Sequence, residues 1–320
     1  MVELGYPRPR IVMSMCLGIS PVRYNGSIVY DNFVETLKRY VDVQPFCPEV
    51  AVGLGVPRNP VVLCDEGGDI RLVDSKTGID LTERFADTVS RFIESLNFVD
   101  GFLLKSASPS CGVGDAKVYG RDRRVIRRSD GLLTLLARSV QPFLPVESER
   151  RLMNYSIRRS YLIKVFSLAF LREALCSLTS KDGIADIHRK LKYVIMLYSP
   201  SHLRILGQLV AKRKGYEVEE LRESYSRLFK EAIAHTPSRG SYANVFSHIY
   251  RHVKDLMTQE ERRYVNTLLM NYRLGREPLR TIVVYFRGLL HRFGNRYIAE
   301  QVFVDPFPEE LDHIFVTDGG

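Results

Sequence analysis

Three short apolar segments, each followed closely by a cysteine among turn-forming residues, constrain the fold of this chain more than any other feature. The segments and their cysteines are residues 10–15 with Cys16, residues 41–46 with Cys47, and residues 101–105 with Cys111. Short apolar runs bounded by Gly, Pro and Ser are typical of buried strands. In an open α/β sheet, ligands bind beyond the carboxyl ends of the strands. We therefore expect the three thiols to converge on one crevice.

Thiols are soft ligands, so three of them at one crevice indicate metal or redox chemistry. Their spacings match neither the compact ferredoxin run nor a paired zinc knuckle. The alternative is that a cysteine is a small buried hydrophobe. This alternative fits Cys64, within a predicted hairpin strand, and Cys176, on the apolar face of a predicted helix. The odd total of five cysteines argues against a disulfide framework in a cytosolic chain.

Strands and helices alternate over the first third of the chain. The expected elements are strand 10–15, helix 31–40, strand 41–46, a hairpin of residues 61–64 and 70–73, helix 82–96 and strand 98–104. Asp31 is the expected N-cap of the first helix, and Gly67 and Gly68 supply the hairpin turn. This alternation predicts an α/β domain with a parallel sheet and right-handed crossovers.

The pattern changes in the second part of the chain. Residues 121–131 are mostly basic and indicate the beginning of a linker, and residues 141–145 form another break. The helical periodicity beyond that break predicts only helices to about residue 302. We therefore expect an α/β domain over residues 1–130, a helical connector over residues 131–180 and an all-α domain over residues 181–320.

The length and hydropathy of the chain bound its class. A chain of 320 residues with 45% hydrophobic residues can bury the cores of two domains. It contains no apolar run near the roughly 18 residues that a membrane span needs, and its N-terminus lacks the apolar region of a signal peptide. These features predict a cytoplasmic protein without a membrane partner.

Charge is distributed unevenly along the chain. Residues 1–120 contain 12 Lys and Arg against 15 Asp and Glu, whereas residues 121–320 contain 34 against 22. Twelve of the 17 tyrosines lie beyond residue 150, several beside basic residues. Basic side chains bind phosphates and tyrosines stack on unpaired bases, so this half suggests an RNA partner. The alternatives are a surface rich in ion pairs, and tyrosines that belong to the core.

Several motifs of the first half, in this order, resemble the thiouracil desulfidase family. They are Cys16-Leu17-Gly18, Val22-Arg23-Tyr24-Asn25-Gly26, Cys47-Pro48-Glu49-Val50, Gly53-Leu54, Pro57-Arg58, Gly78-Ile79-Asp80-Leu81-Thr82, and Leu104-Lys105 followed by Ser108-Pro109-Ser110-Cys111-Gly112. Residues 185–311 resemble, more loosely, the YbgA-type helical domain that is often fused to that family. The looser motifs are Leu206-Gly207, Asn244-Val245-Phe246-Ser247-His248, Tyr272-Arg273, and Gln301 followed by Pro306 and Pro308. The two-domain arrangement is similar to that of desulfidases acting on 4-thiouridine, including in tRNA.

The resemblance implies a cofactor and a reaction. It implies a 4Fe–4S cluster held by Cys16, Cys47 and Cys111, with one open iron that lacks a protein ligand. A soft iron prefers sulfur to oxygen, so it would act as a Lewis acid on a thiocarbonyl group. Water attack would then convert the thiolated uracil to uracil and release sulfide without net redox change. The implied partner is tRNA or a thionucleotide.

The resemblance also implies catalytic roles for two residues. Glu49 would act as the base for water, and Ser108 would orient or relay a proton. Each lies within three residues of a cysteine of the implied cluster, so proximity follows from the chain. The alternatives are that Glu49 is a loop carboxylate capping a turn, and that the Ser108 hydroxyl closes a local turn with the backbone.

Basic residues near the same loops are candidates for substrate binding. Lys105 is placed to contact a phosphate or a developing negative charge, with a solvated lysine as the alternative. Arg23 and Arg58 either contact a nucleotide phosphate or hold the loops together. The basic cluster that follows Cys111 is placed to guide a polyanion to the crevice. Its members are Arg123, Arg124, Arg127 and Arg128.

Three functions remain open on the sequence. The first is an iron–sulfur desulfidase of thiolated RNA or thionucleotides, in which the helical domain presents the substrate. The second is a scavenger of free thiobases with no RNA role. The third is a non-catalytic RNA-binding module with an iron–sulfur or zinc site. The sequence leaves open the oligomeric state and the position of the sulfur, 2-thio or 4-thio.

Overall fold

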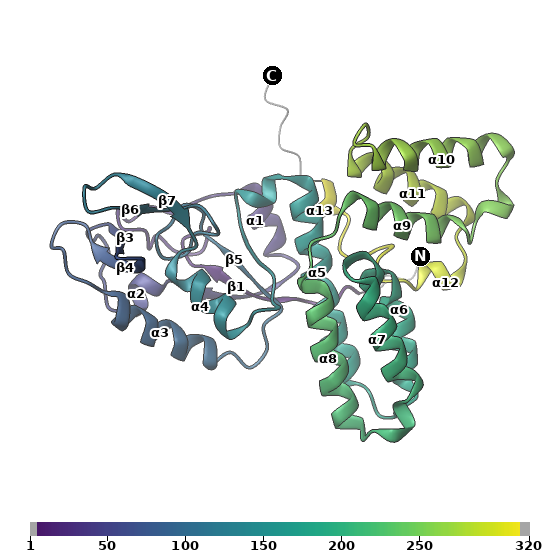
Figure 1. The fold of residues 1–320 in the computed structure, drawn as a ribbon, viewed down its shortest axis with the longest axis horizontal. Helices are drawn as coiled ribbons and strands as arrows, with labels where there is room; N and C mark the ends of the chain where they lie inside the picture. Colours follow the sequence, from purple (N-terminus) through teal and green to yellow (C-terminus); the bar gives the residue numbers. More distant parts are fainter. Residues whose placement is uncertain (1–4, 314–320) are drawn as a thin grey trace. The chain divides into compact units, whose positions relative to one another are not determined.

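Two structural units make up the described part of the chain, residues 5–313 of the computed structural model. The first unit comprises residues 8–161 and 309–313, and the second comprises residues 5–7 and 162–308. The chain passes between the units within a single long helix, α5 (Tyr155–Cys176) (Figure 1). The expected outer ends of the two domains, residues 1–4 and 314–320, lie outside the described residues.

The first unit contains all eight strands found among the described residues. The strands are β1 (Arg10–Ser14), β2 (Asp42–Phe46), β3 (Val61–Glu66), β4 (Asp69–Asp74), β5 (Gly101–Leu104), β6 (Ala116–Tyr119), β7 (Val125–Ser129) and β8 (Val146–Ser148). Its helices before α5 are α1 (Asn32–Leu37), α2 (Pro48–Ala51), α3 (Thr82–Glu94), α4 (Leu132–Val140) and the 3-10 turn η1 (Arg151–Met153). The short α13 (Glu310–His313) also belongs to this unit.

The predicted parallel sheet is confirmed, with the strand order β2-β1-β5-β8. Ser14, the last residue of β1, is in register with Phe46, the last residue of β2. Leu104, at the end of β5, is likewise in register with Ser148, at the end of β8. Because neighbouring parallel strands end level with each other, the segments that follow them emerge at one edge of the sheet.

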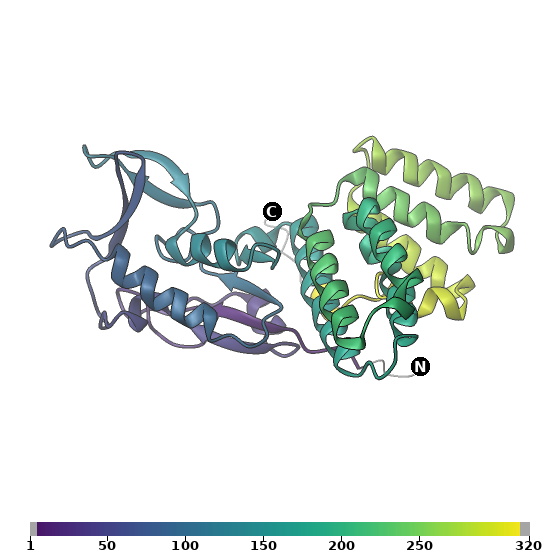
Figure 2. The ribbon, with the colours of Figure 1, turned by 60° about the horizontal axis from the view of Figure 1, so that its bottom comes forward.

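A second sheet, with the order β4-β3-β6-β7, shares a core with the first. The predicted β3–β4 hairpin is confirmed, and β6 joins β3 in parallel before pairing antiparallel with β7. Val12 and Phe102 of the first sheet and Leu63 of the second belong to one buried cluster with Phe85 of α3. Strands β1 and β5 are almost entirely buried in this core, since other elements cover both faces of the sheet that contains them (Figures 1 and 2).

Two sequence expectations about this unit were wrong. Residues 121–131, expected to begin a linker, contain β7, and Val146–Ser148 form β8 in a region expected to contain only helices. Four of the five β7 residues are exposed, so its sequence lacks the apolar alternation of a half-buried strand. Strand β8 has only three residues, too few for a periodic pattern, and it forms by pairing with β5.

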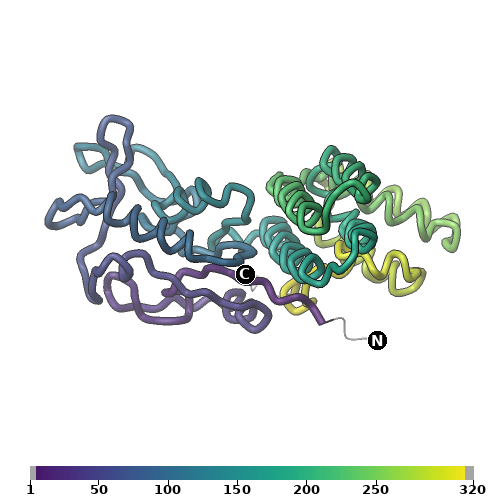
Figure 3. The backbone as a smooth tube through the Cα atoms, turned by 90° about the horizontal axis from the view of Figure 1, so that it is seen from below, coloured from purple at the N-terminus to yellow at the C-terminus, as the bar shows by residue number. Residues whose placement is uncertain are grey.

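The second unit contains only helices among its described elements, which confirms the predicted fold class of an α/β region followed by a helix-rich region. After α5 they are α6 (Gly183–Tyr198), α7 (Pro200–Ala211), α8 (Val218–Ala234), α9 (Arg239–Tyr250), α10 (Gln259–Arg273), α11 (Leu279–Phe293) and α12 (Arg296–Ala299), with the 3-10 turns η2 (Arg213–Gly215) and η3 (Lys254–Leu256). Helix α6 packs against α7, α8 and α9. The path of the backbone through these helices can be followed in Figure 3. Phe246 of α9 packs against Phe286 of α11, with ring centroids 4.6 Å apart.

Most of the tyrosines discussed for the helical region are buried, whereas Tyr264 and Cys176 are exposed. Six of its tyrosines are buried, and they are Tyr161, Tyr193, Tyr198, Tyr225, Tyr242 and Tyr272. These side chains belong to cores, as one of the two alternatives had it, whereas Tyr264 is exposed. Cys176, expected on a buried helical face, is exposed at the end of α5. No helix within residues 5–313 is both long and apolar enough to cross a lipid bilayer.

Candidate functional site

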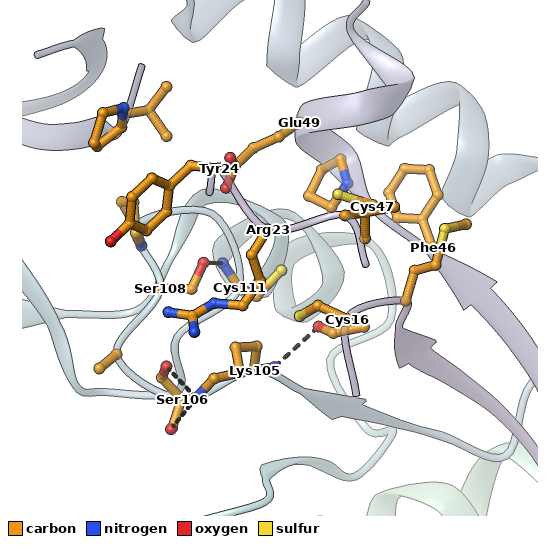
Figure 4. Close-up of a pocket in the computed structure, with 18 of the residues that line it drawn as sticks. Cys16, Arg23, Tyr24, Phe46, Cys47, Glu49, Lys105, Ser106, Ser108 and Cys111 are labelled. Carbon is orange, nitrogen blue, oxygen red and sulfur yellow. Dashed lines mark hydrogen bonds between the residues drawn. The ribbon is translucent and has the colours of Figure 1, made fainter. Parts of the chain in front are cut away.

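A cavity of about 280 Å³ lies at the carboxyl edge of the parallel sheet (Figure 4). Its walls come from the loops that follow β1, β2, β5 and β8, from residues 22–24, and from Arg58, Pro60 and Val61. Eight of the predicted site residues line it, and they are Cys16, Arg23, Cys47, Glu49, Arg58, Lys105, Ser108 and Cys111. Segments distant in sequence therefore meet here because the strands that carry them end at the same edge.

The loops of the first two cysteines are short and tied to the strand ends. The Met15 N–H donates to the Phe46 carbonyl at 3.0 Å, so the chain entering Cys16 remains hydrogen-bonded to β2. Cys47 is the N-cap residue of α2, and its carbonyl accepts from the Ala51 N–H at 2.9 Å. Pro48 occupies the first helical position, where its fixed φ and missing N–H are tolerated.

The Cys111 loop is held by the beginning of α4. The first N–H groups of a helix have no partner within the helix, and here Leu133 donates to the Ser110 carbonyl at 2.8 Å. The Thr134 hydroxyl donates to the Cys111 carbonyl at 2.9 Å. A Cβ atom at Gly131 would lie only 2.6 Å from the Cys111 backbone nitrogen. Only glycine allows this approach of α4 to the cysteine loop.

Burial governs the electrostatics of the three thiols. Burial raises the pKa of Cys16 to about 11, with Cys47 adding to the effect and the charges of Lys105 and Arg23 opposing it. Burial also raises the pKa of Cys47, which the backbone amide of Val50 opposes. The pKa of Cys111 is raised well above its usual range by burial, against a hydrogen bond with Ser14. The cavity therefore favours protonated thiols until a positively charged group binds them.

The donor set fits an iron–sulfur cluster. Three cysteine thiols from three loops line one cavity, and thiolates are the protein ligands of such clusters. Within residues 5–313, no three His, Cys, Asp or Glu side chains are grouped so that they would hold a single metal ion. A cluster makes a different demand, because each of its irons takes its own thiolate. The three thiols therefore fit, in number and kind, the protein ligands of an iron–sulfur cluster.

Glu49 is fixed by two partners in the cavity wall. Its Oε2 accepts from Arg58 Nε at 2.7 Å, and its Oε1 accepts from the Ser110 hydroxyl at 2.8 Å. Arg58 also donates to the carbonyls of Gly55 and Val22, so its contacts hold the loops together. A carboxylate has about four acceptor positions. Glu49 therefore keeps capacity to accept one more proton donor on Oε1.

Ser108 closes the turn that carries Cys111. Its Oγ accepts from the backbone N–H groups of Ser110 at 3.2 Å and of Cys111 at 3.1 Å. A hydroxyl has two acceptor positions and one donor. Because both acceptor positions are used by the turn, the Ser108 O–H remains the group that can donate into the cavity. The turn alternative and a proton-donating role are compatible at this residue.

Lys105 is held in an ion pair, so the alternative of a solvated side chain was wrong. Its Nζ donates to Glu149, whose side chain is only 5% exposed. Glu149 also accepts from the Ser106 N–H at 2.8 Å and the Ser106 hydroxyl at 2.6 Å. The parallel register explains the pair, because Lys105 and Glu149 directly follow Leu104 of β5 and Ser148 of β8. The fixed ammonium group lies where it opposes the raised pKa of Cys16.

The four arginines of the basic cluster are not brought to the cavity. Arg123, Arg124, Arg127 and Arg128 lie on the β6–β7 hairpin, and none is among the described residues that line the cavity. Arg127 donates to Asp65 at 3.0 Å, and Arg128 donates to the Asp115 carbonyl at 3.3 Å. Residues 121–128 are exposed, so these arginines lie on the surface of the first unit.

Sequence reasoning missed four residues of this site. Ser14 is buried at the end of β1, and its Oγ accepts from the Lys105 N–H at 2.9 Å. Ser110 orients Glu49, while Glu149 and Arg150 follow β8. Ser14 adjoins a recognised motif and Ser110 lies within one, so the sequence could have identified both. Glu149 and Arg150 had no such signal, because their strand was itself unrecognised.

Comparisons with known proteins divide the chain in a similar way. A family model described as 2-thiouracil desulfurase matches residues 11–149, and one described as DUF1722, a protein of unknown function, matches residues 192–308. YbbK of Bacillus subtilis (strain 168) is 30% identical over 112 residues, which cover 32% of this chain and 74% of that protein. YbgA of Escherichia coli (strain K12) is 20% identical over 154 residues, covering 48% of this chain and 91% of that protein.

One solved structure is also similar to this chain. It is described as the [4Fe-4S]-dependent thiouracil desulfidase TudS. It is 32% identical, covers 45% of this chain and 93% of its own, and aligns with a TM-score of 0.37.

The raised thiol pKa gives a testable pH dependence in the cluster-free protein. At pH 8, a thiol with a pKa of about 11 is ionised in about one molecule in a thousand, and only the thiolate reacts with iodoacetamide. We expect Cys16 labelling to accelerate about tenfold per pH unit between pH 7 and 9.5. Peptide mass spectrometry measures the rate, with exposed Cys176 as the reference for reagent access. A plateau below pH 9 would contradict the raised pKa.

Proposed function

Since the chain belongs to the 2-thiouracil desulfurase family, we propose that it is a cytoplasmic, iron–sulfur-dependent desulfidase of thiolated uracil bases. Its substrates are thionucleotides or 4-thiouridine in tRNA. In the reaction, the oxygen of water replaces sulfur at the ring carbon, and the sulfur leaves as sulfide with the protons of that water. No electron is gained or lost, so the reaction needs no external oxidant or reductant.

One observation carries this proposal. Three thiols, Glu49 and Ser108 line a single cavity, although three different strands and their loops supply them. Cys16, Cys47 and Cys111 would hold the cluster. When bound, it supplies a soft Lewis-acidic iron for the thiocarbonyl sulfur. The loops leave the cavity large enough to admit a small ligand beside the thiols.

The protein residues supply the proton transfers. Arg58 and Ser110 fix the Glu49 carboxylate, and its remaining acceptor position on Oε1 takes a proton from the attacking water. The Ser108 hydroxyl, held by two backbone N–H groups, directs its proton into the cavity and donates to the base ring. Glu49 thereby acts as the proton acceptor and Ser108 as the proton donor.

Loss of the base tests this assignment. Glu49→Gln retains the shape of the side chain but removes its ability to accept the proton, so we expect kcat to fall by about 10²–10⁴-fold. The assay follows the near-UV thiocarbonyl absorbance and sulfide release anaerobically, with 4-thiouridine and 2-thiouracil after reconstitution with iron and sulfide. Iron and sulfide content should match the unchanged protein.

The control for that experiment is Glu66→Gln, an exposed carboxylate in the same unit that does not line the cavity. Full activity in the control with loss in Glu49→Gln supports the assignment. Turnover by Glu49→Gln at the unchanged rate would exclude Glu49 as the base. No turnover by the fully loaded unchanged protein on any thiolated base would refute the enzyme itself.

We assign the RNA contact to the β6–β7 hairpin and to the basic helical half. Residues 121–128 of the hairpin are all exposed, and five of the eight are arginine. Arg127 donates to Asp65 and Arg128 to the Asp115 carbonyl, and Arg124 makes only an exposed ion pair with Asp122 at 3.6 Å. The side chains of Arg121 and Arg123 have no hydrogen-bond or ion-pair partner among the described residues. Exposed arginines on a strand edge fit the regular negative charge of a phosphodiester backbone. The helical unit would present the RNA substrate.

The triple variant Arg121→Gln, Arg123→Gln, Arg124→Gln tests the hairpin while keeping the Asp65–Arg127 pair. We expect kcat/KM on 4-thiouridine-containing tRNA, relative to 4-thiouridine 5′-monophosphate, to fall about tenfold or more. Its dependence on salt should also weaken, because fewer counterions are released. A matched variant removes three exposed charges elsewhere in the unit: Lys76→Gln, Arg84→Gln, Arg91→Gln. An unchanged ratio in the hairpin variant would favour an enzyme that scavenges small thiobases.

A further inference from the structure

Exposed apolar side chains of the helical unit are concentrated around α10 and α11. Among the described residues of this unit, six large hydrophobic side chains are exposed, and all but Ile205 lie within residues 256–284. The five others, each more than half exposed, are Leu256, Tyr264, Met270, Leu274 and Val284. Apolar residues scattered singly over a surface are common, whereas a group of them marks an interaction surface. Tyr264 and Met270 belong to α10, and Leu274 is its C-cap residue.

Helix α10 is covered on one side. Its buried residues are Val265, Leu268, Leu269 and Tyr272. Among the described elements, α10 packs closely only against α9 and α11 (Figures 1 and 2). A stripe of exposed residues, spaced alternately three and four positions apart, runs along the opposite face, and its members are Glu260, Arg263, Thr267, Met270 and Leu274. Two helices that pack along their lengths meet at residues with this spacing.

The charges on this outer face of α10 are not engaged within the described chain. Glu261, which lies nearer the core, accepts from Arg292 at 2.8 Å. By contrast, the side chains of Glu260, Arg263 and Arg273 have no hydrogen-bond or ion-pair partner within residues 5–313. Glu260 lies in the first turn of α10 and Arg273 in the last turn. A second α10 that runs in the opposite direction therefore brings each acid beside a base.

Tyr264 is held in place although its side chain is 54% exposed. Its ring lies against the ring of Tyr285 from α11, with the centroids 5.2 Å apart. Tyr285 in turn packs edge-on against the buried ring of Phe286. An aromatic ring that is already ordered loses little conformational entropy on binding, and tyrosine is enriched among the residues that dominate interfaces. The sulfur of a methionine makes favourable contacts with such a ring, so Tyr264 and Met270 are suited to each other.

We propose that a second copy of this chain binds the outer face of α10, with the two α10 helices antiparallel and Thr267 at the two-fold axis. Glu260 then lies beside the partner's Arg273, and Tyr264 lies beside the partner's Met270. The two residues of each pair are nearly equidistant in sequence from Thr267. A two-fold interface uses the same surface on both copies, so its charges must be complementary to themselves, as they are here. The antiparallel helix dipoles also attract each other.

Other occupants fit this face less well. A parallel pair of α10 helices would bring Glu260 beside the partner's Glu260 and Arg263 beside the partner's Arg263, and like charges repel. An RNA backbone would be attracted by the arginines but repelled by Glu260, and it offers little to Met270 and Leu274. Two helices about 22 Å long provide an interface at the low end of the roughly 1,200–2,000 Å² of stable complexes. We therefore expect a reversible dimer with a dissociation constant in the micromolar range.

Sedimentation velocity of the full chain, free of nucleic acid, tests this dimer between about 1 and 100 μM. A reductant is present because Cys176 is exposed and would otherwise form disulfides between copies. We expect the sedimentation coefficient of the unchanged protein to rise with concentration. The double variant Met270→Gln, Leu274→Gln should raise the dissociation constant about tenfold or more. The matched control is Ile205→Gln, which removes an exposed apolar side chain of α7 in the same unit.

Exchange of charges tests the antiparallel direction. Glu260→Arg alone and Arg273→Glu alone each place two like-charge pairs in the dimer, so each should weaken association about tenfold or more. An equal mixture of the two single variants has opposite charges at both pairs and should associate as the unchanged protein does. Circular dichroism shows whether each variant retains its helices.

Three results would overturn the proposal. The first is an unchanged protein that is monomeric at every concentration. The second is an unchanged dissociation constant in Met270→Gln, Leu274→Gln, because the interface would then lie elsewhere. The third is a monomeric protein in which that double variant loses affinity for unmodified tRNA, because the face would then contact RNA. Sedimentation needs neither a cluster nor turnover, so its outcome is independent of the desulfidase assay.

Discussion

The parallel hydrogen-bond register of β2-β1-β5-β8 is the constraint on which the rest of the site depends. It brings Ser14 level with Phe46 and Leu104 level with Ser148. A shift by one residue would turn every side chain of a strand to the opposite face of the sheet. Five titratable residues that line the cavity lie within three residues of these strand ends, and they are Cys16, Cys47, Glu49, Lys105 and Arg150. Their convergence is therefore a property of the sheet rather than of the loops alone.

Two ion pairs, Glu49 with Arg58 and Glu149 with Lys105, lie in the cavity wall. Removing one member of a buried ion pair leaves an uncompensated charge, which costs about 3–5 kcal/mol. Glu49 with Arg58, and Glu149 with Lys105, avoid that cost while fixing the direction of each side chain. The thiols lack such partners, and burial raises the pKa of each. The site thus holds its acidic side chains in ion pairs and keeps its buried thiols in the protonated form.

The sequence predicted the elements whose residues carry a periodic pattern. The apolar stripe Phe85, Val89 and Ile93 identified α3, and Asp31 caps α1 by accepting the Val34 N–H at 2.9 Å. Motif residues identified the thiols, Glu49 and Ser108, which line one cavity. Strand β8 is too short to show a periodic pattern. The position of Glu149 and its ion pair with Lys105 could therefore be found only from the register of the sheet. Strand β7 has exposed residues on both faces, so its sequence shows no alternation of apolar and polar residues, and the strand was not predicted.

Mössbauer spectroscopy of protein reconstituted with ⁵⁷Fe tests the central claim most directly. If Cys16, Cys47 and Cys111 hold three irons of one cluster, one iron in four will have a distinct signal. That signal alone will shift when 4-thiouridine is added, whether or not turnover follows. Cys64→Ala should leave the spectrum unchanged, whereas Cys111→Ala should abolish it. Four equivalent irons that do not respond to the thiolated base, or a full cluster in Cys111→Ala, would contradict the account.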